Sequence, residues 1–177
     1  MPPMPVVPGS LAALLSLLRP SFTAPTFDTF CWLVVGFVSR VGERTVCGMW
    51  QAVRLAGVFH HSRAHGFFAR ARWSPDELGL RLADLLVAVL VPAGKPLRLA
   101  LDDTLFHRAG RKLFGACLHH DPHADGGPRV GFGNSWVVLG LVLRLPIVER
   151  PLCLPVLFRH LLRKQSIAEL QKAGHGG

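Results

Sequence analysis

Long apolar runs are missing from this 177-residue sequence. The two most apolar stretches, residues 30–38 and 136–143, fall well short of the about 20 residues that a membrane-spanning helix needs. No basic residue precedes the apolar run at 11–18, as it would in a signal peptide. We therefore expect a soluble cytoplasmic protein. The mean hydropathy of +0.34 leaves a membrane-surface protein as an alternative.

Paired cysteines are also missing. Cys31, Cys47, Cys117 and Cys153 form no C-x-x-C pair, and their spacing matches no zinc-binding pattern. Each lies in an apolar stretch, which predicts buried free thiols in a reducing compartment.

Acidic residues are scarce. The sequence has eleven Asp and Glu residues and twenty Lys and Arg residues, which gives a formal net charge of +9 and a pI near 10.7. A basic surplus favours a polyanionic partner such as nucleic acid, although an arginine-rich coding background would also produce it. Since half the residues are apolar and 18% are charged, the chain can bury a core and is not expected to be disordered.

The first half of the chain has helical patterns. Six prolines in residues 1–25 predict a loose arm with one short helix at 11–18. Apolar residues recur at three- and four-residue steps from Thr26 to Val38. Further helices are expected at 46–55, 62–70 and 74–91. Ser74 is a candidate N-cap for the last, before Pro75 and two acids.

The second half has the patterns of strands. We expect strands at 96–102, 112–119 and 136–145, and a strand or helix at 156–163. Residues 120–133 are rich in Asp, Gly and Pro and predict a loop, in which Gly131 and Gly133 would serve turns. The chain is thus predicted to be α+β, with an all-helical arm that leads into the start of an α/β sheet.

Two adjacent carboxylates, Asp102 and Asp103, are predicted at the end of the first strand. Burial and like charges both penalise ionised acids there, and a divalent cation removes that penalty. Carboxylate oxygens suit Mg²⁺, and two such ions can promote phosphodiester chemistry. Alternation along a strand sends the two side chains to opposite faces. The alternative is a solvated strand end before a turn.

The motif Leu101-Asp102-Asp103-Thr104, followed by Lys112 and Gly115, resembles the first-strand motif of bacterial insertion-sequence transposases with a ribonuclease-H-like DDE domain. Residues 60–74, 131–138 and 150–159 resemble, in order, the preceding helical region and the later strands of the same family. This resemblance spans roughly 26–164. It implies a helical and DNA-binding region at 26–92 and a partial DDE domain at 93–164. The Pro-rich arm at 1–25 and a divergent flexible tail at 165–177 lie outside it.

The resemblance implies that Asp103 is the first catalytic acid and a ligand of Mg²⁺, with Asp102 pointing away. A one-residue error in the alignment would exchange the two. The second Asp and the Glu of the family are not identified, because neither the loop acids Asp121 and Asp125 nor Glu149 and Glu169 stand at matching places. We therefore expect a truncated transposase that is inactive alone and exposes an unpaired sheet edge and core surface.

Residues 40–81 carry seven arginines and three acids, a net charge of +4. The helices expected at 46–55 and 62–70 have helix-turn-helix proportions, so the second could enter a DNA groove while arginines hold phosphates. The candidate DNA-binding residues are Arg54, Arg63, Arg70 and Arg72. The alternatives are an amphipathic pair that packs on the sheet and, for the whole chain, a non-catalytic DNA-binding module. Expected partners are DNA and a second copy or a full-length transposase subunit, in a bacterial, nucleoid-associated setting.

Histidines cluster at His119, His120 and His123. Zinc hydrolases place such ligands on rigid elements, whereas these fall on a strand end and a Pro/Gly loop, so a solvated loop is favoured over a zinc site. His60, His61 and His65 are expected at the surface of the basic helical region.

Overall fold

The computed structural model describes residues 7–110, 113–121, 127 and 129–172. By its internal contacts the chain divides into two compact units, Met1–Leu85 and Leu86–Gly177, and each is considered by itself. Within the described residues, no helix has the length and apolar character needed to cross a membrane.

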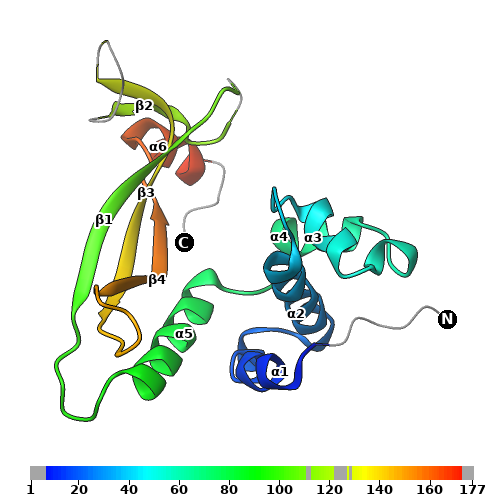
Figure 1. Cartoon of the computed structure of the whole chain (residues 1–177). Helices are drawn as coiled ribbons and strands as arrows, with labels where there is room; N and C mark the ends of the chain where they lie inside the picture. The colour runs from blue at the N-terminus through cyan, green and yellow to red at the C-terminus, as the bar shows by residue number, and fades with distance from the viewer. Residues whose placement is uncertain (1–6, 111–112, 122–126, 128, 173–177) are drawn as a thin grey trace. The chain divides into compact units, whose positions relative to one another are not determined.

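The first unit is helical throughout (Figure 1). Helix α1 covers Gly9–Ser16, α2 Ala24–Ser39, α3 Val46–Ala52 and α4 Ser62–Ala69, with 3-10 turns at Arg19–Ser21 (η1) and Leu55–Gly57 (η2). Helix α5, Pro75–Leu90, crosses the boundary between the units. All five predicted helices are therefore present, and the Ser74 hydroxyl accepts a hydrogen bond from the Glu77 amide at 3.2 Å as the capping prediction requires.

Aromatic side chains dominate the core of the helical unit. Trp32 and Leu33 of α2 pack with Met49 and Trp50 of α3 and with Phe67 of α4, and the cluster also takes in Val53, Leu55 and Ala64. The Trp50 ring is 1% exposed, and its indole N–H donates to the Phe59 carbonyl at 3.1 Å. This bond satisfies the one polar atom of a large buried ring.

Helix α3 ends earlier than the sequence pattern suggests. Arg54 adopts the left-handed conformation with φ of 57°, which no helix interior tolerates, and η2 follows directly. The predicted helix at 46–55 is thus split. Leu55 is nevertheless fully buried, so its apolar side chain serves the core from the 3-10 turn.

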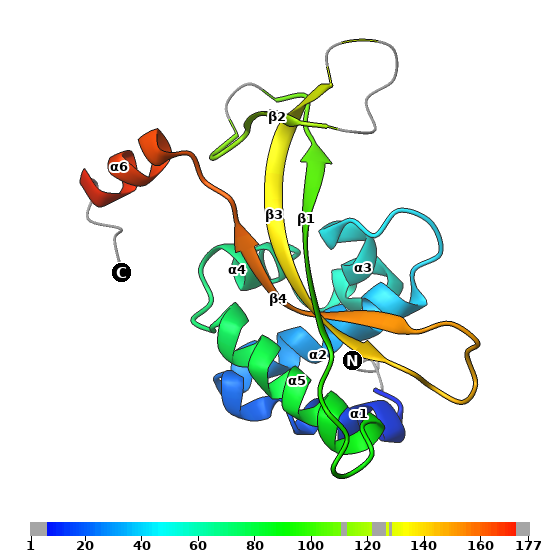
Figure 2. The same cartoon turned by 90° about the vertical axis from the view of Figure 1, so that its left-hand side faces the viewer.

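The second unit holds a four-stranded antiparallel sheet (Figure 2). Strand β1 covers Leu99–His107, β2 Cys117–His120, β3 Val130–Leu143 and β4 Leu152–His160. Among the described residues each of β1, β2 and β4 pairs with β3. Helices followed by a sheet confirm the predicted α+β class, and the arrangement is compatible with a partial ribonuclease-H-like fold.

The strands start and end at residues that differ from the predicted ones. Strand β1 continues to His107, so Asp102 and Asp103 lie in its middle and not at its end. The predicted strand at 112–119 is reduced to Cys117–His120, and Lys112 lies outside the described residues. Strand β3 begins at Val130, inside the predicted loop, because its first residues pair with β2 and with the end of β1. The ambiguous segment at 156–163 is mostly strand.

Gly131 and Gly133 lie in strand β3, so the turn function predicted for them is wrong. A Cβ atom at Gly133 would collide with the Phe106 carbonyl oxygen of β1. A Cβ atom at Gly131 would come within 2.6 Å of His107 Cε1. Gly133 is therefore needed for the close approach of the β1 backbone, whereas the atoms near Gly131 belong to side chains.

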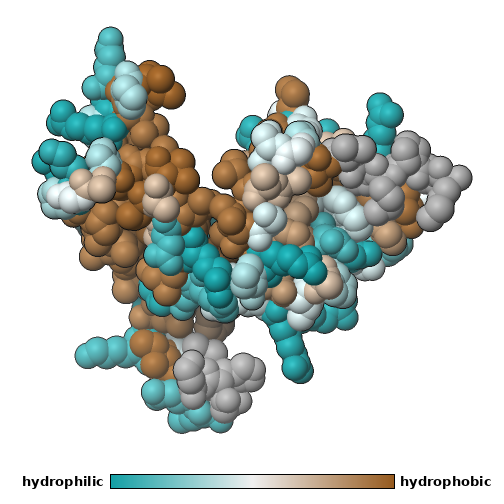
Figure 3. Space-filling model, turned by 90° about the horizontal axis from the view of Figure 1, so that it is seen from below, coloured by the Kyte–Doolittle hydropathy of each residue, from teal (hydrophilic) through white to brown (hydrophobic). Residues whose placement is uncertain are grey.

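Much apolar surface of the sheet is uncovered. Leu99 is 60% exposed, Leu101 70% and Phe158 51%. Figure 3 shows brown hydrophobic areas that reach the surface of the molecule. Strand β1 also has one edge without a partner strand among the described residues. Such a surface is typical of a sheet that packs against further structure.

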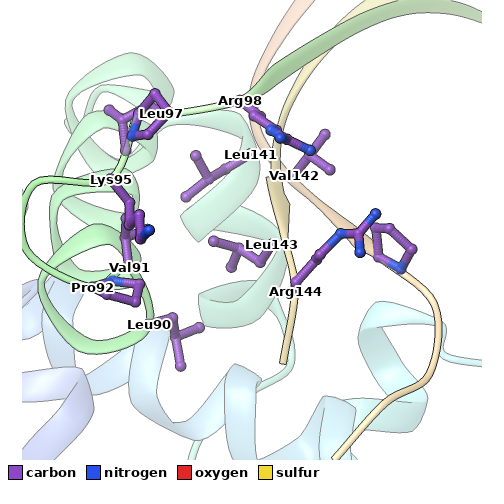
Figure 4. A pocket seen from close by; sticks show the side chains of 12 residues that line it. Leu90, Val91, Pro92, Lys95, Leu97, Arg98, Leu141, Val142, Leu143 and Arg144 are labelled. Carbon is purple, nitrogen blue, oxygen red and sulfur yellow. The ribbon is translucent and has the colours of Figure 1, made fainter. Parts of the chain in front are cut away.

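A mainly apolar hollow of about 500 Å³ lies between β3 and the segment after α5 (Figure 4). Leu141 and Leu143, which are 2% and 4% exposed, point from β3 towards that segment. Neither Asp102 nor Asp103 lines this hollow. Lys95, Arg98 and Arg144 add basic groups to its apolar walls, and no acidic side chain lines it.

The expected flexible tail begins with helix α6, Lys164–Lys172. Residues 173–177 lie outside the described part of the chain.

The crossing of α2 and α3 depends on Gly36, where a Cβ atom would collide with the Met49 carbonyl oxygen. We predict that Gly36→Ala lowers the free energy of unfolding by roughly 1–3 kcal/mol, because the backbone of one helix must move. Gly66→Ala is the matched control. Gly66 lies in α4 with no atom within 4 Å of its missing Cβ, so that change should leave stability equal or raise it by up to about 1 kcal/mol. Urea denaturation followed by tryptophan fluorescence measures both, and equal effects would contradict the packing argument.

Candidate functional site

Asp102 and Asp103 are both exposed in the middle of strand β1. The Asp103 amide donates a hydrogen bond to Oδ1 of Asp102 at 2.9 Å, so the Asp102 carboxylate is turned back onto the strand backbone. Among the described residues, the Asp103 carboxylate has neither a hydrogen bond nor an ion pair. Asp103 is therefore the carboxylate with free oxygen atoms for a cation.

The register of the sheet fixes what lies beside Asp103. It stands opposite Val137 of β3, which stands opposite Arg159 of β4, so the three side chains share one face. Asp102 stands opposite Val138 and Phe158 on the other face. Asp103 thus has an apolar neighbour on the adjacent strand, with a guanidinium group on the same face two strands away.

A complete metal centre is not present among the described residues. They contain no group of three or more His, Cys, Asp or Glu side chains that could hold an ion. Asp121 is buried and engaged elsewhere, Glu149 lies in the turn region before β4, and Asp125 falls outside the described residues. One free carboxylate suits Mg²⁺ as a single ligand. The described residues do not fit a two-ion site.

A histidine–carboxylate pair was missed by sequence reasoning. His107 at the end of β1 contacts Asp121 with 3.1 Å between Nε2 and Oδ2, and the Asp121 side chain is 8% exposed. The pair lies over Gly131, where a Cβ atom would also come within 3.0 Å of the carboxylate. The signal in the sequence was Gly131 itself, since a strand glycine often marks a close approach.

His160 lies in a polar and aromatic contact group on the face opposite Asp103. The Asn134 amide donates to the Phe114 carbonyl at 3.0 Å and lies 3.0 Å from His160 Nε2. Trp136 stacks on the imidazole with 4.8 Å between ring centres. Burial lowers the pKa of His160 below its ordinary value, and the nearby His119 lowers it further. The surroundings therefore favour the neutral imidazole.

The four candidate DNA-binding arginines differ in their contacts. Arg63 is half-buried, with its guanidinium over Trp32 and Phe59 at 4.9 and 4.6 Å from the ring centres. It also donates to the Thr29 hydroxyl at 3.0 Å and to the Pro25 carbonyl at 3.3 Å. These contacts join α4 to α2, so Arg63 stabilises the helical unit.

Arg54, Arg70 and Arg72 are exposed and belong to the same helical unit. No ion pair to an acid is found for them within the described part of the chain. Their guanidinium groups are therefore available for an anionic partner. Helices α3 and α4, which would form the predicted helix-turn-helix, share a core with α2.

The prediction of four buried thiols is wrong for two of them. Cys31 is buried and Cys117 half-buried, but Cys47 and Cys153 are exposed. Neighbouring residues of a helix or strand point to different faces, so an apolar stretch does not by itself bury each member. His119 and His120 lie in β2, and His119 Nε2 is 3.0 Å from Cys117 Sγ. His123 lies outside the described residues.

The comparison with protein families decides the class of this protein. The sequence model described as DDE superfamily endonuclease matches residues 18–174. The chain belongs to the DDE superfamily endonuclease family. No curated protein and no solved structure was found to match it. Membership supports nuclease or transposase-type activity on DNA, and DDE endonucleases generally use divalent metal ions. The matched range contains Asp103 and all four candidate arginines.

We predict a specific pH dependence from His160. Because its pKa is lowered on folding, the unfolded chain takes up a proton first as the pH falls. The contribution of neutral His160 to stability should be complete above its ordinary pKa of 6.5, and should decline as the pH falls from there through the lowered pKa. His160→Phe, which keeps an aromatic ring against Trp136, should remove this decline.

Urea unfolding between pH 5 and 8, followed by tryptophan fluorescence, measures the effect. His120→Phe is the control, because the His120 side chain is exposed and has no hydrogen-bond partner in the described structure. An unchanged slope of stability against pH in His160→Phe would show that His160 is not the group responsible.

Proposed function

We propose that this chain is a transposase of the insertion-sequence type that acts in DNA strand cleavage and transfer, with Asp103 as its first catalytic acid and a ligand of Mg²⁺. The observation that carries this proposal is the free Asp103 carboxylate on β1, within a chain of the DDE endonuclease family. When bound, Mg²⁺ would neutralise charge at a phosphodiester under attack.

The chain is proposed to be inactive by itself. One carboxylate cannot hold two metal ions, and the described residues provide no second and third ligand near Asp103. A full-length transposase subunit would bring the missing Asp and Glu, whereas a second copy could bring to Asp103 only the acids that this sequence already contains. The exposed leucines of β1 and its unpaired edge support such a partner.

DNA is the proposed partner of the helical unit. Its exposed Arg54, Arg70 and Arg72 have no acidic partner in the described structure and can contact phosphates. The net charge of +9 favours association with DNA, and the proposed setting is the nucleoid of a bacterial cytoplasm.

A non-catalytic DNA-binding module is the second candidate function. The helical unit is compact by itself and contains the three exposed arginines, whereas the acid site is incomplete among the described residues. In this case the sheet would serve as a scaffold, and Asp103 would have no role in binding a cation.

The two candidates differ in what Asp103 does with a cation. We predict that millimolar Mn²⁺ broadens the backbone NMR signals of Asp103 and Val137 in the purified chain, because a paramagnetic ion at the carboxylate relaxes nearby nuclei. Asp103→Asn should abolish the broadening, whereas Asp102→Asn, the matched change on the opposite face, should keep it. Broadening that disappears only in Asp102→Asn would mean that the assignment of the two acids is reversed. Absence of broadening in the native chain would favour the non-catalytic module.

Nicking of supercoiled plasmid DNA in Mg²⁺ or Mn²⁺ tests the proposed inactivity. We expect no nicked product from the chain alone, because the missing carboxylates cannot be replaced by water. Nicking that disappears in Asp103→Ala would instead show that this chain, alone or paired with itself, completes the site.

DNA binding should depend on salt and on the exposed arginines. Removal of one arginine that holds a phosphate should reduce the slope of log affinity against log salt by about 0.9. We therefore expect a reduction of about 1.8 in the double variant Arg70→Gln/Arg72→Gln, if both arginines hold phosphates, measured by fluorescence anisotropy with a labelled duplex. Arg81→Gln is the control, because Arg81 already pairs with Glu77 at 3.0 Å. Equal slopes in all three proteins would contradict a role for these residues.

A further inference from the structure

A thiol and an imidazole from different helices meet at the surface of the helical unit. Cys47 Sγ of α3 lies 3.3 Å from His65 Nε2 of α4. Both residues are exposed. The two positions are eighteen residues apart, so only the packing of α3 against α4 brings them together.

Two further histidine rings, those of His61 and His60, lie beside the imidazole of the pair. The His61 ring stands edge-on to the His65 ring, with 5.9 Å between their centres. The His61 and His60 rings have 4.1 Å between their centres. Nδ1 of His60 accepts a hydrogen bond from the Ser62 amide at 3.2 Å. No acid side chain forms an ion pair with these histidines among the described residues. A cysteine thiol with an imidazole base within hydrogen-bond reach is an arrangement that activates cysteines.

We propose that Cys47 is a reactive thiol, activated by His65, that is modified by peroxide and by soft carbon electrophiles. This site goes beyond the proposed function and does not depend on it. Exposure allows the reagent to reach the sulfur, and the imidazole accepts the thiol proton, so the thiolate is the attacking species.

The reaction with hydrogen peroxide is a two-electron oxidation of sulfur. The proton of Cys47 passes to Nε2 of His65, and the thiolate attacks one oxygen of the peroxide. A sulfur–oxygen bond forms and the oxygen–oxygen bond breaks, giving a sulfenic acid and hydroxide. The hydroxide takes the proton from His65 and leaves as water, so peroxide is reduced as sulfur is oxidised.

Modification at this place would act on the helical unit. An added group must separate Cys47 from His65, and these residues join α3 to α4. The same two helices bound the core that contains Trp50 and Phe67. Oxidation of Cys47 would thus loosen the packing of α3 on α4.

Competitive labelling of the whole chain tests the proposal. The protein is pulsed with iodoacetamide from pH 6 to 9, and each cysteine is quantified by peptide mass spectrometry. Cys153 is the internal control, because it is exposed but has no imidazole contact in the described structure. Cys31 should give the slowest labelling rate. Burial raises the pKa of its thiol, and the charge of Asp28 raises this pKa further. At pH 7 Cys47 should react on the order of ten times faster than Cys153, because Cys47 alone of the two has an imidazole in reach to accept the thiol proton.

Two variants separate activation from simple exposure. His65→Phe should slow Cys47 to the rate of Cys153, with helix content by circular dichroism unchanged. His61→Phe, which removes a neighbouring imidazole but leaves His65, should retain the fast reaction. In a parallel experiment with hydrogen peroxide, dimedone should trap a sulfenic acid at Cys47 in the native chain and not in His65→Phe. Equal rates at Cys47 and Cys153 in the native chain, or a fast Cys47 in folded His65→Phe, would overturn the proposal.

Discussion

Antiparallel pairing to β3 determines how most of the second unit is arranged. This fourteen-residue strand pairs with β1, β2 and β4, and its register decides which side chains share a face. Through it Asp103 shares a face with Val137 and Arg159, while Trp136 meets His160 on the other. Gly131 and Gly133 allow the close approach of β1 at its far end. A change in this register by one residue would exchange the two faces and remove Asp103 from its neighbours.

In the helical unit, the packing of aromatic side chains determines how the helices are arranged. Trp32, Trp50 and Phe67 bring α2, α3 and α4 together, and Arg63 covers Trp32 and Phe59 with its guanidinium. The arginines of this unit therefore serve two purposes. Arg63 is held in the packing, whereas Arg54, Arg70 and Arg72 are exposed and have no acidic partner in the described structure. The contact of Cys47 with His65 is a further consequence of the same packing.

The apolar face of β1 and the single free carboxylate have a common explanation. A sheet that exposes Leu99 and Leu101, with one edge lacking a partner strand among the described residues, needs further structure to cover it. The proposed cation site, to which the described residues contribute only Asp103, would need further ligands. A second polypeptide that supplies both would stabilise the sheet and complete the acid site together. Assembly and activity would then be coupled in this member of the DDE endonuclease family.

The sequence by itself determined the order of elements, the helices and the family. Apolar periodicity and capping at Ser74 are local, so they could be read directly, and the Asp102-Asp103-Thr104 motif lay within the matched range. Other features could not be read from the sequence in this way. They are the limits of the strands, the packing of Gly131 and Gly133, the exposure of Cys47 and the contact of His107 with Asp121. They depend on which residues face each other across strands or helices that are distant in sequence. Only the tertiary structure decides those pairings, because the free energy that favours one register comes from contacts between segments and not from either segment alone.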